Sequence, residues 1–258
     1  MIAALRRSAV AACLAVLAGS AVAQENVTIN VNHEAASGRV LVNGVPVMRF
    51  DSQPRQPDSG PPTSMVNGGM WMNDGPNEVV VEVKSKGPGS NVRVVLLKSI
   101  DAPAVLDSTV KGSDGRVVQS VTMSGLPHWS WLHSEPWSGD PRAVLDAVRS
   151  LHRALDTKDV TGHDAMRKAF EADMSQMMGG PMPDEVRKEI HESIRKSTVL
   201  PLPAEMTVSA HYDNRLFVVS APNGKPPVRL REPGMSDDDL IETGQYWVRL
   251  GGAWQLVR

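Results

Sequence analysis

A tryptophan-rich segment, residues 126–140, carries the residue types in this chain that best suit ligand binding. It holds Trp129, Trp131 and Trp137, together with His128 and His133, between prolines. Aromatic faces can stack on sugar rings, and Trp129 and Trp131 alternate, so both point the same way in an extended chain. One interpretation is therefore a binding surface for a glycan. The other, which we favour, is that the rings fill a seam between two domains with their N–H groups at its wet edge.

A group of methionines suggests a different chemistry, the binding of a soft metal. Its members are Met174, Met177, Met178 and Met182, with His163 earlier in the chain. Thioether and imidazole ligands suit Cu(I), and the first three methionines would share one face of a helix. That face is also the apolar stripe of the expected helix, and methionine commonly fills gaps in cores. We therefore expect packing, with no metal or cofactor, and keep a copper site as the weaker alternative.

The sequence contains none of the common catalytic or cofactor-binding motifs. It contains no nucleophile elbow, phosphate-binding loop, dinucleotide fingerprint or zinc-protease motif, and none of its 7 histidines forms an i, i+4 pair. This pattern favours a protein without catalytic activity, although an enzyme that uses no such motif stays open.

Residues 1–23 have the order of a secretory signal peptide. Two arginines precede an uncharged Ala/Val/Leu run, and Ala21 and Ala23 are the small residues before the expected cleavage site. We expect export to the periplasm of a Gram-negative bacterium. Cys13 resembles a lipoprotein acceptor, but it follows Arg7 too closely for the apolar core of about 7–15 residues that a signal peptide needs, so we expect no lipid anchor.

Composition limits the classes of protein and partner. Cys13 is the only cysteine, so the exported chain would lack disulfides and thiolate sites. The formal net charge is −2, which removal of Arg6 and Arg7 shifts to −4, and this gives no electrostatic reason to expect a nucleic-acid partner. No segment approaches the roughly 20 apolar residues of a transmembrane helix. The sequence does not indicate an oligomeric state.

Two regions of different pattern must position these side chains. In residues 24–125, apolar and polar residues alternate as they do in half-buried strands, for example at Val27, Ile29 and Val31. Asn43-Gly44 predicts a hairpin turn. This region is expected to be an all-β sandwich. A Trp/Pro-rich connector, residues 126–140, should join it to an α+β domain, residues 141–258.

The α+β domain is expected to place three helices on a curved antiparallel sheet. Asp140 should cap the first helix, Thr161 the second, and Pro183 should open the third, while Gly179 should end the second. Hydrophobic residues recur at helical spacing along all three. The strands that follow should turn at Asp213-Asn214 and at Gly251-Gly252.

Both regions resemble known families. The helix that ends with residues 154–159, the strand pair around Asp213-Asn214 and the terminal residues 254–257 resemble the cone-shaped fold of ketosteroid isomerases and nuclear transport factors. That resemblance implies an interior in which the family's enzymes place an aspartate and a proton donor, and no residue here matches them by motif. Asn43-Gly44 and residues 75–77 resemble the jelly-roll domains that accompany carbohydrate-active proteins.

These observations lead us to expect an exported, non-catalytic binding or accessory protein of the bacterial cell envelope. Its ligand, a glycan or another envelope protein, would meet the connector and the mouth of the C-terminal cone. The alternative is an enzyme similar to ketosteroid isomerase, acting on a small apolar substrate. The weaker alternative is a periplasmic copper-binding protein.

Overall fold

The computed structural model describes residues 27–52, 62–98, 103–236 and 239–257. The expected signal peptide and Cys13 lie outside these residues, so export and the absence of an anchor stay predictions. The chain divides into two compact units between His128 and Trp129, inside the segment predicted as the connector. Among the described residues, no helix combines the length and the apolar character needed to cross a membrane.

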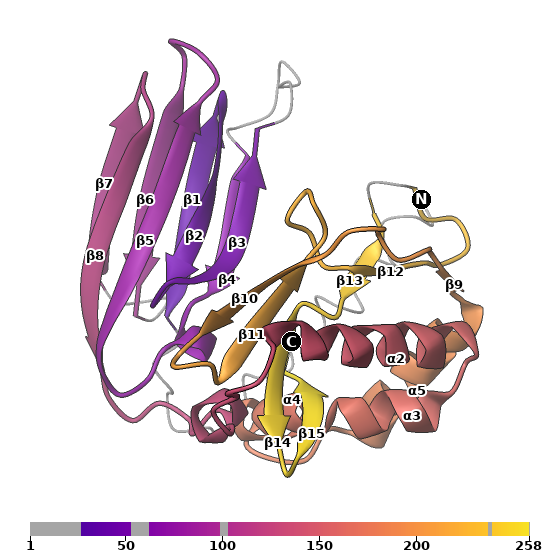
Figure 1. The fold of residues 1–258 in the computed structure, drawn as a ribbon. Coiled ribbons are helices and arrows are strands. Elements are labelled where there is room, and N and C mark those ends of the chain that lie inside the picture. Colours follow the sequence, from indigo (N-terminus) through magenta and orange to yellow (C-terminus); the bar gives the residue numbers. More distant parts are fainter. Residues whose placement is uncertain (1–26, 53–61, 99–102, 237–238, 258) are drawn as a thin grey trace. The chain divides into compact units, whose positions relative to one another are not determined.

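The N-terminal unit consists of two antiparallel four-stranded sheets (Figure 1), with strand orders β4-β1-β6-β7 and β3-β2-β5-β8. The strands are β1 (Thr28–Glu34), β2 (Ala36–Val42), β3 (Val45–Asp51), β4 (Thr63–Asn67), β5 (Gly75–Ser85), β6 (Asn91–Leu97), β7 (Ala104–Lys111) and β8 (Gly115–Met123), with a short 3-10 helix, η1 (Gly69–Trp71). Alternate residues are buried, for example Ile29 and Val31 in β1. The predicted period-two pattern is confirmed.

The turn between β2 and β3 has the geometry that its sequence predicts. Asn43 and Gly44 have φ of 50° and 79°, both in the left-handed region, and Val42 pairs with Val45. The Asn43 side chain also donates a 2.8 Å hydrogen bond to Asn77 Oδ1. An asparagine followed by glycine is therefore suited to this hairpin both by its backbone and by its side chain.

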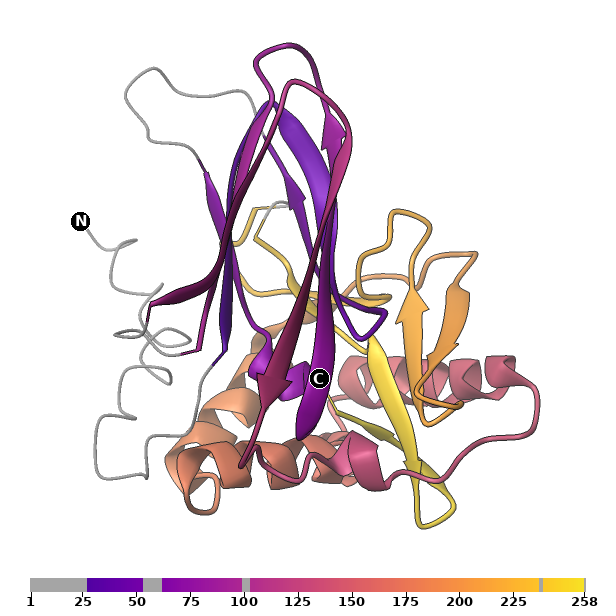
Figure 2. The same ribbon diagram turned by 90° about the vertical axis from the view of Figure 1, so that its left-hand side faces the viewer.

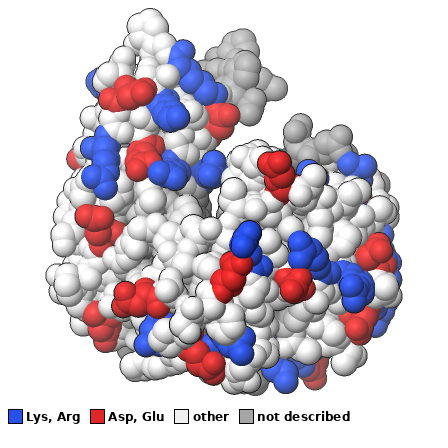
Figure 3. All heavy atoms as spheres, in the orientation of Figure 1, with Lys and Arg blue, Asp and Glu red and all other residues white. Residues whose placement is uncertain are grey.

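Charged side chains of both signs are interspersed on the molecular face in Figure 3. Within the N-terminal unit, Arg39 pairs with Glu82 at 2.5 Å and Arg93 with Asp107 at 2.6 Å, each pair joining neighbouring strands. These outward side chains solvate the sheet faces opposite the buried valines.

The C-terminal unit contains four helices among its described residues, where three were expected. They are α2 (Val144–Asp156), α3 (Val160–Met166), α4 (Lys168–Met178) and α5 (Asp184–Lys196), with the 3-10 helices η2 (Ser130–His133) and η3 (Pro141–Ala143). The second predicted helix is broken at Arg167, whose φ of −104° and ψ of 9° leave the helical region. Its predicted cap is also wrong, because Asp159, not Thr161, accepts the hydrogen bond from Gly162 N–H at 2.9 Å.

The other predicted helix ends are confirmed. Asp140 accepts a 2.9 Å hydrogen bond from Arg142 N–H at the start of η3, which runs into α2. Gly179 ends α4 with a φ of 66°, and Gly180 N–H bonds to the Ser175 carbonyl at 3.0 Å. This is the left-handed helix end that glycine favours.

Two antiparallel sheets, rather than one, accompany these helices, with orders β10-β11-β14-β15 and β13-β12-β9. Their strands are β9 (Thr198–Val199), β10 (Thr207–His211), β11 (Leu216–Ser220), β12 (Val228–Arg231), β13 (Ile241–Thr243), β14 (Tyr246–Leu250) and β15 (Ala253–Leu256). The prediction of a two-residue turn at Asp213-Asn214 is wrong. Tyr212 also has a left-handed backbone conformation, and the turn is longer because His211 pairs with Leu216. The Gly251-Gly252 turn is confirmed.

The helices and sheets of the C-terminal unit share one hydrophobic core. Figure 2 shows the helices grouped together in this unit. Val148 and Leu151 of α2 pack in the same cluster as Phe217 of β11 and Trp247 of β14, all at 0% exposure. The predicted stripe of α2 is therefore the face that meets the sheet.

Candidate functional site

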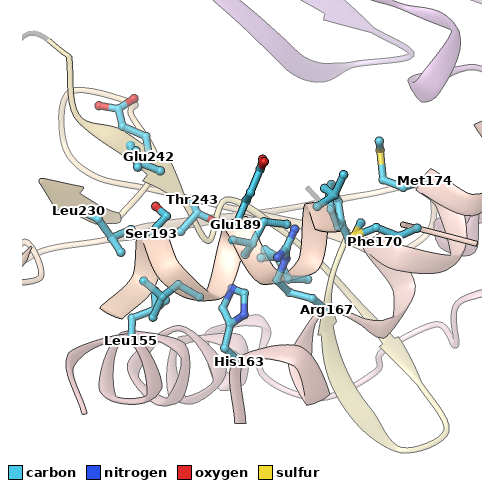
Figure 4. Close-up of a pocket in the computed structure, with 16 residues that line it drawn as sticks. Leu155, His163, Arg167, Phe170, Met174, Glu189, Ser193, Leu230, Glu242 and Thr243 are labelled. Atoms are coloured by element: carbon cyan, nitrogen blue, oxygen red, sulfur yellow. The ribbon is translucent and has the colours of Figure 1, made fainter. Parts of the chain in front are cut away.

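A cavity of about 560 Å³ opens in the C-terminal unit, beside α5 (Figure 4). Its apolar wall includes Leu155, Phe170, Ile190, Leu230, Ile241 and Leu256. Its polar lining side chains are His163, Arg167, Glu189, Ser193, Glu242 and Thr243. A mostly apolar cavity with a few polar groups, within the range of about 300–1,000 Å³, is typical of a small-molecule site.

Helix periodicity supplies one side of this cavity. Val186, Ile190 and Ile194 recur every four residues along α5, and all three line the cavity. Because residues four apart share a helical face, the sequence pattern alone places them together. Strands β12 and β13, which pair antiparallel, contribute Leu230 and Ile241 directly opposite each other.

His163 is the buried titratable group of the wall, at 5% exposure. Its Nδ1 lies 3.1 Å from Oδ1 of Asp164. Burial, reinforced by the charge of Arg167, lowers the pKa of His163 from 6.5 to about 4, although Asp164 acts in the opposite direction. The imidazole is therefore neutral at neutral pH, and since an ionised carboxylate only accepts, Nδ1 carries the proton and Nε2 is the acceptor.

Asp164 binds a second histidine as well. Its Oδ2 lies 2.8 Å from Nε2 of His191 on α5, so this carboxylate joins α3 to α5. Both of its oxygens are thus engaged by imidazoles. The arrangement fixes the orientation of His163 in the cavity wall.

Arg167 lies at the break between α3 and α4 and enters the same wall. Its guanidinium carbon lies 4.3 Å from the centre of the Phe170 ring, a cation–π contact. Figure 4 shows Arg167 beside His163, with the Glu189 side chain directed away from both. Burial lowers the pKa of Arg167, but an arginine stays charged in a protein.

The remaining polar side chains of the wall differ in how they are satisfied. Glu242 pairs with Lys225 at 3.2 Å, and Ser193 donates a 2.5 Å hydrogen bond to Glu232. Glu189 is exposed and makes no ion pair with a described residue. The cavity wall therefore holds one partly buried cation, Arg167, and one neutral imidazole, His163, among mostly apolar side chains.

The structure separates the predicted methionine group. Met174 and Met182 line the cavity together with His163, whereas Met177 and Met178 are not among its lining residues. In the described part of the chain, no group of three or more His, Cys, Asp and Glu could hold a metal ion. A copper site that uses the methionines stays a prediction.

The predicted tryptophan site has a different environment from this cavity. Trp131 is 1% exposed and its ring centre lies 4.3 Å from that of Tyr212, while Trp129 is 3% exposed. Trp137 is half-buried, under the Arg249 guanidinium at 4.5 Å. His133 is exposed, and His128, also exposed, belongs to the N-terminal unit. Ligand binding by these residues stays a prediction.

Arg167 and Glu189 were not singled out from the sequence. His163 and Arg167 are four residues apart, next to the stripe that contains Met166 and Phe170. That spacing places two polar side chains on the edge of an apolar face, which was the available signal. Comparisons of the chain with family models, curated proteins and solved structures found no match.

Proposed function

We propose that this chain is an exported, non-catalytic binding protein whose C-terminal cavity takes a small apolar ligand. The observation that carries the proposal is the cavity itself, of about 560 Å³ and bounded by side chains such as Leu155, Ile190 and Leu256. Removing a ligand's apolar surface from water there would contribute about 25 cal/mol per Å² buried, before the costs of association.

A neutral dye that fluoresces in apolar surroundings, N-phenyl-1-naphthylamine, tests this proposal. We expect saturable binding to the full chain. Val186→Phe should weaken it, because the larger ring occupies the cavity, whereas Lys188→Phe, exposed on the same helix, should not. Dye binding that is absent, or equal in both variants, would contradict the proposal.

Catalysis of the ketosteroid-isomerase kind is the second candidate, favoured by the desolvated His163 in the cavity. A pKa of about 4 makes this imidazole a weak base, and the two carboxylates of the wall are exposed or paired with Lys225. Binding is therefore better supported than proton transfer. Turnover of a β,γ-unsaturated ketosteroid to its conjugated isomer, lost in His163→Asn, would favour the enzyme instead.

The wider proposals concern the rest of the chain. We infer that the two four-stranded sheets form a β-sandwich similar to a jelly roll, and that the C-terminal unit is a cone-like domain. The signal-peptide pattern supports the periplasm as the location. A glycan or an envelope protein remains our proposed partner for the segment that contains Trp137, whose ring is half-buried.

A further inference from the structure

The Arg167 guanidinium is the feature of the cavity that the proposed function does not use. Neither a hydrogen bond nor an ion pair joins this guanidinium to any residue that the structure describes. Its carbon lies 4.3 Å from the centre of the Phe170 ring. Arg167 is partly buried, and a charge that is even partly removed from water is normally paired, because losing its hydration is costly. The ring covers one face of the guanidinium and leaves the N–H groups at its edge for another partner.

The carboxylates near Arg167 are already engaged. Asp164 is bound by His163 at 3.1 Å and by His191 at 2.8 Å. Glu171 lies 3.2 Å from Arg187, which is also close to Asp184. Among the residues that the structure describes, no carboxylate therefore pairs directly with Arg167, although the charges of Asp164 and Glu171 raise its pKa.

The charges of the wall restrict what anion would fit. Glu242 carries its own partner, Lys225, at 3.2 Å, and Glu189 is directed away from Arg167 (Figure 4). His163 is neutral, so it can accept a hydrogen bond but adds no second positive charge. One cation in an apolar cavity balances a single negative charge, and a guanidinium matches a carboxylate with two parallel hydrogen bonds.

We propose that the cavity binds an amphipathic carboxylic acid, with its carboxylate on the Arg167 guanidinium and its hydrocarbon part against Leu155, Ile190 and Leu256. This inference rests on the proposed binding function and names its ligand class. Arg167 is then the residue that determines specificity, since a neutral ligand of the same length would displace water from the partly buried guanidinium without giving it a partner.

Decanoate and decanol test the inference, because both have ten carbons and only decanoate is charged. Each is used to displace N-phenyl-1-naphthylamine from the full protein. We expect the wild type to bind decanoate about 10–100 times more tightly than decanol, the gain of a charge-assisted hydrogen bond. Arg167→Met should abolish that preference by weakening decanoate binding to about the affinity of decanol. Arg195→Gln, exposed on α5 and outside the cavity, should keep it.

The outcomes separate this inference from the proposed function. Failure of the wild type to bind dye or either ligand overturns both. Binding of dye and decanol without a preference for decanoate overturns only the inference that the ligand is a carboxylate. A preference that survives in Arg167→Met overturns it as well.

If Arg167→Met does not fold, Arg167→Lys retains the charge and should keep part of the preference. NMR gives a second readout: the pKa of His163 should rise when decanoate is bound and should not rise when decanol is bound.

Discussion

Protonation of His163 should destabilise the C-terminal unit at acid pH. The charged groups around the imidazole are Asp164 and Arg167 beside it and His191 on α5, and burial is the largest influence on its pKa. In the folded chain that pKa is about 4, against 6.5 for the ordinary imidazole. Between these values the unfolded chain binds a proton at His163 that the folded chain does not. The contribution of this residue to stability is therefore fully present above about pH 6.5 and is lost as the pH drops toward about 4.

The magnitude follows from the shift. At about 1.36 kcal/mol per pKa unit, a decrease from 6.5 to about 4 corresponds to a loss of about 3 kcal/mol in the free energy of unfolding. Below pH 4 both states are protonated, and this contribution stops changing. His163→Asn keeps an amide N–H for Asp164 but does not titrate, so it should lack this part of the acid loss.

Urea unfolding at a series of pH values measures the effect. Tryptophan fluorescence follows the C-terminal unit, because Trp71 is the only one of the 6 tryptophans in the other unit. The wild type and the exposed variant Arg149→Gln should show the same acid loss, and His163→Asn a loss smaller by about 3 kcal/mol. Parallel pH profiles for wild type and His163→Asn would refute the reasoning.

Two further changes test how the C-terminal unit is held together. Asp159→Ala removes the side chain that accepts from Gly162 N–H at 2.9 Å and should cost about 1 kcal/mol in urea unfolding, whereas Asp156→Ala, which removes no cap, should cost little. Trp131→Ala should cost about 3–5 kcal/mol because its side chain is 1% exposed and packs on Tyr212; a stability unchanged in that variant would mean that the ring does not support the core.

The sequence was sufficient for features that depend on near neighbours. Alternating valines identified the strands of the N-terminal unit, and Asn43-Gly44 identified a turn, because strand faces and left-handed residues are local properties. The caps at Asp140 and Gly179 have the same basis. A local pattern could not show that Arg167 would leave the helical region, since the hydrophobic spacing continues across it.

Tertiary structure alone decided the candidate site. Residues from α2 to β15 meet at one cavity although they are far apart in the chain, and none carries a motif. His163 was visible as a residue type, but its low pKa depends on burial and on the charge of Arg167, which only the folded arrangement provides. The same arrangement engages Asp164 and Glu171 with other partners and leaves the guanidinium of Arg167 facing an apolar space. Periodicity can predict which face of an element is buried, whereas the partner of each charge depends on contacts distant in sequence.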